Sequence, residues 1–317
     1  MNFLITSSGR RVGLVKAFIN TFKKQKYNGK IFTTDLNPKL APVSYFTHCF
    51  KVGNFLDKDY IEKLLEICIK NKISIVIPTI DSELEVLSDN INLFKNHGID
   101  LIVSQPDIIN KCSDKIKTEI IFKSLNIKYP KIYEKEHLKF PVFVKPKLGS
   151  NSKGVYTAKD IGDIPPNHLK SDQYIFQDLI DKKLYDEFTV DLYFDKKSNM
   201  VSCVPRIRMK VVGGESNQGI TKKKKFIKTL RNNFTSTDGF KGCITLQLFV
   251  NKINDNDIYG IEINPRFGGG YPFSYNAGAN FPKMILDEYI FNKKLIYNED
   301  WKSDFINIRY EKEIILN

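Results

Sequence analysis

The segment GIEINPRFGGG, residues 260–270, places three different polar side chains before three consecutive glycines. Side chains alternate between the two faces of a strand, so Glu262, Asn264 and Arg266 would share one face. A carboxylate and a nearby amide offer the hard oxygen ligands that suit Mg²⁺, which usually takes one or two carboxylates plus substrate phosphates. A guanidinium on the same face can hold a phosphoryl group or an oxyanion. The alternative is an ordinary polar strand face that ends in a glycine turn.

An earlier apolar segment, CITLQLFV at residues 243–250, carries Gln247 between two leucines. If this segment and residues 260–270 pair as antiparallel strands, Gln247 places its amide oxygen beside Glu262. The candidate metal site would then draw on two neighbouring strands.

The segment FVKPKLGSNSKGV, residues 143–155, joins a lysine at a strand end to a small polar turn. Such a turn can hold a phosphate between a point charge, here Lys145, and several backbone N–H groups. Its glycines have the spacing of a P-loop, but Val155 and Tyr156 follow in place of Lys and Ser or Thr, so a P-loop is excluded. An ordinary hairpin with exposed lysines remains the alternative.

Carboxylates cluster in PTIDSELEVLS, residues 78–88, directly after an apolar strand. The carboxyl edge of a parallel sheet is where such folds bind ligands, which makes Asp81 and Glu83 candidate substrate contacts. The alternative is a capping box, in which Ser82 and Glu85 begin a helix.

Two further strands carry charged residues on one face. Arg206 and Arg208, in the segment RIRMKVVGGESNQG, could bind a substrate carboxylate or could be surface cations. We expect the second substrate to enter between this segment and the N-terminal domain. Glu187 lies in EFTVDLYFD, just after residues 176–182, whose backbone could pair with adenine while a nearby carboxylate accepts ribose hydroxyls.

The elements that position these residues follow from the hydrophobic pattern. Apolar strands at residues 3–6, 31–34, 73–78 and 99–104 alternate with amphipathic helices, which predicts a doubly wound α/β domain. Its first turn lacks GxGxxG, so dinucleotide binding is not supported, although the helix after Arg10 and Arg11 could accept an anion. Beyond residue 185 longer strands predict an antiparallel sheet backed by helices.

Composition sets the class of protein. The 317 residues, 42% hydrophobic and 27% charged, predict a globular chain of two or three domains. The scattered cysteines and isolated histidines argue against a zinc site and for reduced thiols in a cytoplasmic protein. No apolar run reaches the length of about 18 residues that a membrane span needs. The net charge of +13 could indicate nucleic-acid binding, for example through the four lysines at residues 222–225. We interpret most lysines as solvated surface residues and expect the positive charge to favour anionic substrates such as nucleotides.

In this order the motifs resemble the ATP-grasp superfamily, most closely single-module members such as one half of the carbamoyl-phosphate synthase large chain and the pyrrolysine-biosynthesis ligase. The resemblance covers nearly the whole chain and implies a mixed α/β and α+β fold. It divides the chain into a Rossmann-like pre-ATP-grasp domain (residues 1–112), a linker helix with a small lid (113–184) and a C-terminal catalytic subdomain (185–317). Residues 308–316 resemble the last strand of such modules.

The resemblance also implies roles for individual residues. ATP and Mg²⁺, with Mn²⁺ as the alternative metal, are the implied cofactors. The residues that match the nucleotide-binding positions are Lys115 and Lys145 for the phosphates, Ser150, Ser152 and Gly154 in the closing loop, Gln177, Asp178 and Leu179 at the hinge, and Glu187 at the ribose. Gln247, Glu262 and Asn264 match the metal ligands, and Arg266 matches the arginine that steadies the phosphorylated intermediate.

The implied activity is ligation of a carboxylate to an amine or to ammonia through an acyl phosphate. The implied partners are small carboxylates and amines, and neither a membrane nor nucleic acid is expected. Because dimers are common in the family that the chain resembles, a homodimer is also implied. The alternatives are an ATP-dependent phosphotransferase on the same scaffold and a non-catalytic nucleotide- or nucleic-acid-binding protein. Gln177 and Asp178 stand where the family more often has a Glu pattern. The preference for adenine or guanine as the nucleotide base therefore stays open. With no amidotransferase motif, this chain would not generate ammonia itself.

Overall fold

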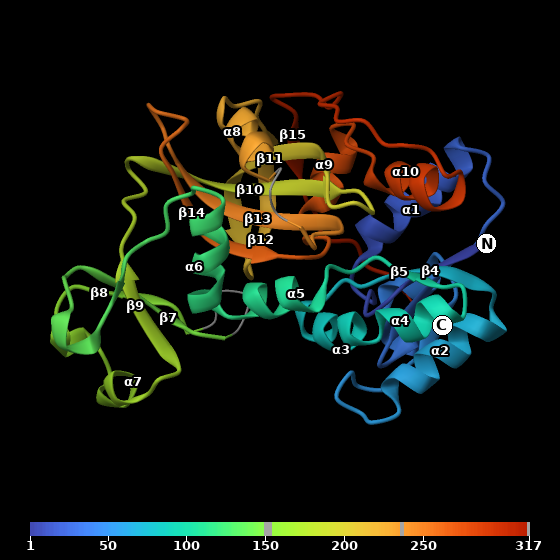
Figure 1. Ribbon diagram of the computed structural model, residues 1–317, viewed down its shortest axis with the longest axis horizontal. Helices are drawn as coiled ribbons and strands as arrows, with labels where there is room; N and C mark the ends of the chain where they lie inside the picture. Colours follow the sequence, from blue (N-terminus) through green and yellow to red (C-terminus); the bar gives the residue numbers. More distant parts are fainter. Residues whose placement is uncertain (149–153, 235–237, 316–317) are drawn as a thin grey trace.

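The computed structural model describes residues 1–148, 154–234 and 238–315. Three sheets follow one another along the long axis of the molecule, as Figure 1 shows. The N-terminal parallel sheet lies at one end, a six-stranded antiparallel sheet occupies the middle, and a four-stranded sheet lies at the other end. This arrangement confirms the mixed α/β and α+β fold expected from the sequence.

The N-terminal sheet has the strand order β3-β2-β1-β4-β5, and all its pairs are parallel. Its strands are β1 (Asn2–Ile5), β2 (Ile31–Asp35), β3 (Cys49–Lys51), β4 (Ile73–Ile77) and β5 (Asp100–Leu101). The helices α1 (Val12–Lys24), α2 (Tyr60–Lys70), α3 (Leu84–Asp89) and α4 (Ile91–Asn96) pack on it. The sequence pattern missed β3, because this short strand at the sheet edge has no buried residue.

Two short helices, α5 (Pro106–Ser113) and α6 (Lys115–Ser124), lead from this domain into the rest of the chain. The side chain of Asp114 accepts hydrogen bonds from the backbone N–H groups of Ile116 and Lys117, at 2.8 and 3.4 Å, and so caps α6. The cap also fixes Lys115 at the first helical position, where it lines a cavity of about 320 Å³ that is called the main cavity below.

The four-stranded sheet has the order β6-β9-β7-β8. It consists of β6 (Ile132–Tyr133), β7 (Val142–Pro146), β8 (Tyr156–Ala158) and β9 (Tyr174–Asp178), with α7 (Pro166–Lys170) beside it. Val142, Val144, Ala158 and Phe176 form most of its small core. The alternation of β7 buries both valines and directs neighbouring side chains to the other face.

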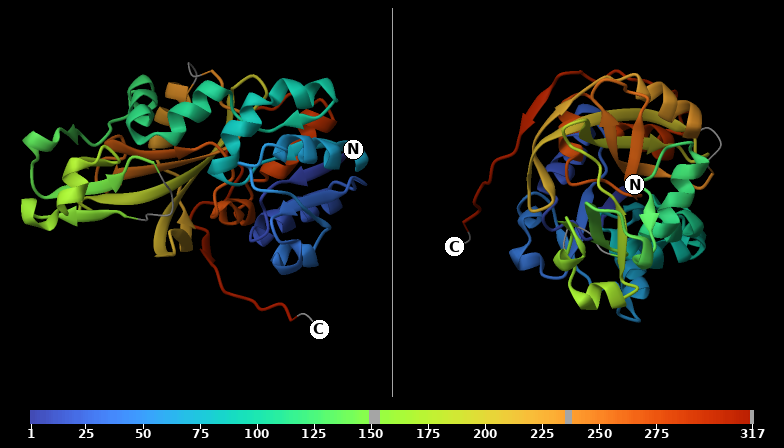
Figure 2. Two further views of the ribbon diagram at one scale, coloured as in Figure 1. Left: turned by 90° about the horizontal axis from the view of Figure 1, so that it is seen from below. Right: turned by 90° about the vertical axis from the view of Figure 1, so that its left-hand side faces the viewer.

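The six-stranded sheet has the order β14-β13-β10-β11-β12-β15, with every pair antiparallel. Its strands are β10 (Tyr185–Phe194), β11 (Met200–Val212), β12 (Glu215–Thr221), β13 (Gly242–Asn251), β14 (Ile258–Asn264) and β15 (Ile306–Ile308). Helices α8 (Phe226–Asn233), α9 (Tyr271–Asn276), α10 (Phe281–Ile285) and the π-helical turn η7 (Leu286–Ile290) accompany it. The last described strand ends at Ile308 and residues 309–315 form no strand, so the expectation of a strand beginning at Ile308 and continuing along the chain is wrong; residue 316 lies outside the described residues. Figure 2 shows the following segment leaving the sheet, and Tyr45 donates a hydrogen bond to the carbonyl of Ile315 at 2.8 Å.

Apolar packing orients the polar faces of this sheet. Phe188, Val190 and Leu192 of β10 are buried on one face, where Phe188 meets Phe226 of α8 edge to face at 5.4 Å. Each such side chain contributes about 1.5–3 kcal/mol through burial. Glu187 and Thr189 alternate with these residues and therefore face the opposite side, where they line the main cavity.

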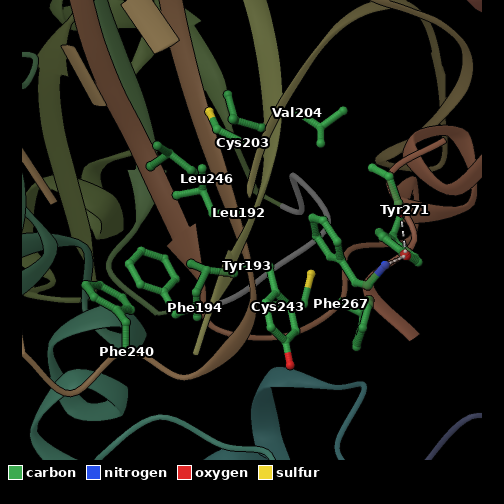
Figure 3. Close-up of a cluster of buried hydrophobic side chains, with 14 of the residues drawn as sticks. Leu192, Tyr193, Phe194, Cys203, Val204, Phe240, Cys243, Leu246, Phe267 and Tyr271 are labelled. Carbon is green, nitrogen blue, oxygen red and sulfur yellow. Dashed lines mark hydrogen bonds between the residues drawn. The ribbon is translucent and has the colours of Figure 1, made fainter. Parts of the chain in front are cut away.

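A second aromatic cluster fixes the chain on both sides of the triple glycine (Figure 3). The rings of Phe267 and Tyr271 lie 4.7 Å apart, and those of Tyr271 and Phe281 lie 5.0 Å apart. The Tyr271 hydroxyl donates to the carbonyl of Ala279 and accepts the N–H of Phe281, at 3.0 and 2.9 Å. Gly260 also serves packing, because a Cβ there would come within 2.4 Å of the Phe122 ring of α6.

Candidate active site

The main cavity, of about 320 Å³, opens where the four-stranded and six-stranded sheets meet the N-terminal domain. Among the residues that the structure describes, seven basic and four acidic ones line it, and this excess favours an anionic ligand. The basic residues are Arg11, Lys115, Lys145, Lys182, Arg206, Arg208 and Arg266, and the acidic ones are Asp178, Glu187, Glu215 and Glu262.

Glu262 lies at the centre of the candidate metal site. Gln247 of β13 is its cross-strand partner and donates through Nε2 to Glu262 Oε1 at 2.7 Å. Asn264 donates through Nδ2 to the same oxygen at 2.9 Å. The strand pairing expected from the sequence is therefore present, with the amide nitrogen of Gln247 facing Glu262 where an oxygen was expected.

Two lysines lie within electrostatic reach of this carboxylate. Lys145 of β7 is only 4% exposed, and its Nζ lies 3.4 Å from the hydroxyl of Tyr129. Burial and then the nearby Lys115 lower the pKa of Lys145 to about 7, against the opposing pull of Glu262. Burial also lowers the pKa of Lys115, again opposed by Glu262. A bound phosphate would supply the negative charge that both ammonium groups favour.

Arg266 connects the end of β14 with the N-terminal domain. Its Nη2 donates to Asp81 and, at 3.3 Å, to Asn264 Oδ1, while Nη1 donates to the carbonyl of Phe267 at 3.2 Å. Nε has no hydrogen-bond partner among residues 1–148, 154–234 and 238–315. Asp81 therefore orients Arg266, and its predicted contact with substrate stays a prediction.

Glu83 lies elsewhere. Its fully buried carboxylate accepts hydrogen bonds from Thr6, Ser7, Tyr60 and the backbone N–H of Thr79, at 2.7–3.0 Å. Burial raises its pKa in spite of these bonds. The predicted substrate contact of Glu83 is wrong, because this side chain braces β1 against β4 and does not line the cavity. The capping box is wrong too, since neither the 3₁₀ turn at Asp81–Glu83 nor α3 has a side-chain cap.

Arg206 is a buried cation, so its interpretation as a surface residue is wrong. The side chain is 1% exposed; Nε donates to Asp191 Oδ2 and to Ser274, both at 3.0 Å, and Nη2 lies 2.9 Å from Asp191. Nη1 has no partner in the described part of the chain. Arg208 also lies inside the cavity, where it donates to Glu187 at 2.5 Å and to the carbonyl of Gly214 at 2.7 Å.

The candidate hinge forms the far end of the cavity. Gln177 and Asp178 end β9, and Leu179 and Ile180 continue along the lining. The buried Oε1 of Gln177 has no partner among the described residues, whereas Asp178 accepts the Tyr133 hydroxyl. Glu187, the candidate ribose residue, lies nearby, with Lys182 at 3.6 Å. Gly154 is described and exposed, but Ser150 and Ser152 lie outside the described residues.

Sequence reasoning missed the ion pair of Glu215 and Arg309. Arg309 donates to Glu215 at 2.5 Å and to the carbonyl of Gly269 at 2.6 Å, and Arg11 Nη1 lies 3.9 Å from Glu215. The available signal was the triple glycine, which indicates close approach. A Cβ on Gly269 would lie 2.7 Å from Glu215, and one on Gly270 would lie 2.6 Å from Arg206.

The basic run at residues 222–225 is partly neutralised. Lys222 pairs with Asp304, and Lys224 lies 2.9 Å from Asp255. These pairs weaken the case for a nucleic-acid surface there.

No helix in the described ranges is both long and apolar enough to cross a bilayer.

Family comparison agrees with this architecture. Residues 3–102 match the family described as PylC-like, N-terminal domain, and residues 112–270 match the ATP-grasp domain. Because the second match spans half of the chain, the protein belongs to the ATP-grasp family. No curated protein matches the sequence at a significant level.

Solved structures share the fold at low sequence identity. N5-carboxyaminoimidazole synthetase from Staphylococcus aureus complexed with ADP matches 97% of this chain and 79% of its own, with 16% identity and a TM-score of 0.70. The biotin carboxylase domain of Hydrogenobacter thermophilus 2-oxoglutarate carboxylase matches 96% of this chain and 73% of its own, with 12% identity and a TM-score of 0.74. The L-amino acid ligase from Bacillus licheniformis matches 90% of this chain and 73% of its own, with 15% identity and a TM-score of 0.63.

Proposed function

We propose that the protein is a Mg-ATP-dependent ligase that joins a carboxylate to an amine or to ammonia through an acyl phosphate. One observation carries the proposal: Glu262 and its two amide neighbours share a cavity with the buried Lys145 and with Arg266. Oxygen donors for a cation and cations for phosphoryl groups therefore lie together, which is the combination that phosphoryl transfer requires. Two of the similar structures are named as a synthetase complexed with ADP and as an L-amino acid ligase, which supports nucleotide-dependent ligation.

In this proposal the nucleotide lies between the four-stranded and six-stranded sheets. The backbone at Asp178–Ile180 and the free Oε1 of Gln177 supply polar groups for the base, and Glu187 supplies a carboxylate for the ribose. Lys115 and Lys145 bind the phosphates. Because a phosphate favours the protonated form of Lys145, nucleotide binding should raise its depressed pKa.

The donor set fits Mg²⁺ when a nucleotide is present. One carboxylate, Glu262, and the amides of Gln247 and Asn264 are hard ligands, and phosphate oxygens would complete the coordination. Within the described residues no three Asp, Glu, His or Cys side chains form a metal site, so the protein by itself offers an incomplete one. The same oxygen chemistry accepts Mn²⁺. When bound, the metal would neutralise charge that develops on the transferring phosphoryl group.

The chemistry needs positioning and electrostatics more than a nucleophilic side chain. A substrate carboxylate oxygen bonds to the γ-phosphorus while the bond from that phosphorus to the β–γ bridging oxygen breaks, and ADP leaves. Arg266, held by Asp81, stabilises the acyl phosphate. The amine nitrogen then bonds to the acyl carbon, phosphate leaves with the electrons of the C–O bond, and the amine releases a proton to solvent.

Release of ADP from Mg-ATP, measured across a panel of small carboxylates and amines with Glu262→Gln as the blank, tests this function. A ligase releases ADP when both a carboxylate and an amine are present. Release that needs one acceptor and leaves a stable phosphorylated product would identify a phosphotransferase. Tight ATP binding with no release for any pair would point to a non-catalytic nucleotide-binding protein.

A further inference from the structure

The end of the main cavity around the triple glycine, here called the acceptor end, holds more guanidinium groups than carboxylates. Asp81 contacts Arg266, Asp191 contacts Arg206, and Glu215 contacts Arg309. Arg11 has no carboxylate of its own, because it shares Glu215 with Arg309, so four guanidinium groups face three carboxylates. Its Nη2 donates to the carbonyl of Thr79 at 3.2 Å, and its closest carboxylate oxygen, on Glu215, is 3.9 Å away.

Several buried guanidinium nitrogens of the cavity have no hydrogen-bond acceptor among the described residues, and two of them, on Arg11 and Arg206, lie close to the triple glycine. Nη1 of Arg11 and Nη1 of Arg206 are both buried, and neither has a hydrogen-bond partner in the described ranges. Arg206 is 1% exposed and Arg11 is 19% exposed at its side chain. A charged donor that is buried without a hydrogen-bond partner is unfavourable, so such groups commonly bind a ligand or an ordered water.

The two donors lie against neighbouring residues of one loop. A Cβ on Gly269 would lie 2.9 Å from Arg11 Nη1, and a Cβ on Gly270 would lie 2.6 Å from Arg206 Nη1. Both arginines also line the main cavity. The glycines thus let two guanidinium groups from different domains approach one short stretch of backbone.

Both arginines are held in place by interactions that a ligand need not break. Arg206 donates hydrogen bonds to Asp191 and Ser274 through Nε, and Arg11 donates one to the carbonyl of Thr79 through Nη2. Burial and then the nearby Arg266 lower the pKa of Arg11, which means that this end of the cavity favours added negative charge.

We propose that Arg11 and Arg206 anchor a carboxylate that the reaction leaves intact, carried by one of the two non-nucleotide substrates. This inference rests on the proposed ligase function, in which the reacting carboxylate lies at Arg266 and the candidate metal site. It narrows the substrate class to a dicarboxylic acid as the acyl component or an amino acid as the amine component. Two guanidinium groups suit a carboxylate, since each offers directed N–H donors.

The test measures binding directly, without turnover. The protein saturated with Mg-ADP is titrated calorimetrically with succinate and, separately, with L-alanine, which distinguishes an anchored acyl component from an anchored amine component. Arg11→Gln should weaken binding of the accepted probe about tenfold or more, since it removes a charge-assisted contact, and should leave ADP affinity unchanged. Arg10→Gln is the matched control, because it removes the same charge from the same turn at an exposed position outside the cavity.

The outcomes are distinct. Equal weakening by Arg10→Gln and Arg11→Gln would mean that only the overall charge matters, and it would overturn the anchor. Unchanged affinity in Arg11→Gln, or no binding of either probe to the wild-type protein at millimolar concentration, would overturn it too.

Gly270→Ala, whose Cβ would displace Arg206 without removing a charge, should also weaken binding of the accepted probe. Parallel ADP-release assays separate the two claims: turnover with an unchanged KM in Arg11→Gln refutes the anchor alone, whereas binding at the anchor without turnover for any acceptor refutes the ligase alone.

Discussion

Lys145 should destabilise the nucleotide-free protein while it strengthens nucleotide binding, so its replacement by methionine separates the two effects. The side chain is 4% exposed and its pKa falls from 10.5 to about 7, chiefly through burial. That fall corresponds to about 5 kcal/mol against the charged form in the folded protein. Lys145→Met removes the charge and keeps an unbranched apolar side chain of similar length.

The sign of the effect depends on pH. Below about pH 7 the lysine is protonated in both the folded and the unfolded chain, so the folded protein bears the full penalty. Between pH 7 and 10.5 the unfolded chain binds one more proton at this site, so the stability of the wild-type protein rises with pH. Lys145→Met should therefore raise the free energy of unfolding most at pH 6, by at most about 5 kcal/mol, and progressively less toward pH 10.

Urea unfolding of the nucleotide-free proteins at pH 6 and pH 9 measures the first effect, and calorimetric titration with Mg-ADP measures the second. Loss of the charged contact should weaken ADP binding by about ten- to a hundredfold. Lys147→Met is the control: this neighbouring lysine is 36% exposed at its side chain and lies 3.4 Å from Asp114, so the change in stability should stay below about 1 kcal/mol. A Lys145→Met protein that is less stable than wild type at pH 6, with unchanged ADP affinity, would refute this reasoning.

Three further variants test other contacts. Glu262→Gln should lose Mg-dependent ADP release by about a hundredfold or more while its circular dichroism stays that of wild type; wild-type activity would remove the metal assignment. Asp191→Asn leaves the buried guanidinium of Arg206 without its countercharge, so urea unfolding should show a loss of about 3–5 kcal/mol; an unchanged midpoint would mean that the pair is not structural. Gly270→Ala should raise KM for the anchored substrate more than KM for ATP, because the new Cβ meets Arg206; equal changes in both constants would contradict a local effect.

Much of the candidate site could be predicted because strand alternation fixes which side chains share a face. Gln247 and Glu262 were paired from sequence since a polar residue between leucines on one strand matched a carboxylate on the next, and the register agrees. The parallel and antiparallel halves were likewise evident from apolar strands that alternate with helices in one half and follow one another in the other.

Other features depend on contacts that local pattern does not encode. Four donors around Glu83 decide which carboxylate after β4 turns inward, and they come from the residues that follow β1, from the residues that follow β4, and from α2. The buried state of Arg206 depends on Asp191 across the β10–β11 hairpin and on Ser274 of α9. The Glu215–Arg309 pair joins residues 94 positions apart, so no spacing rule finds it.

Transfer of oxygen from substrate to phosphate tests the central claim most directly. The carboxylate that supports ADP release would be labelled with ¹⁸O in both carboxyl oxygens and turned over with Mg-ATP and the amine, and the released phosphate would be analysed by mass spectrometry. An acyl phosphate requires that one labelled oxygen leaves with each phosphate, so the account predicts singly labelled phosphate in equal amount to ADP. Unlabelled phosphate formed together with the amide would contradict activation of the carboxylate by phosphoryl transfer.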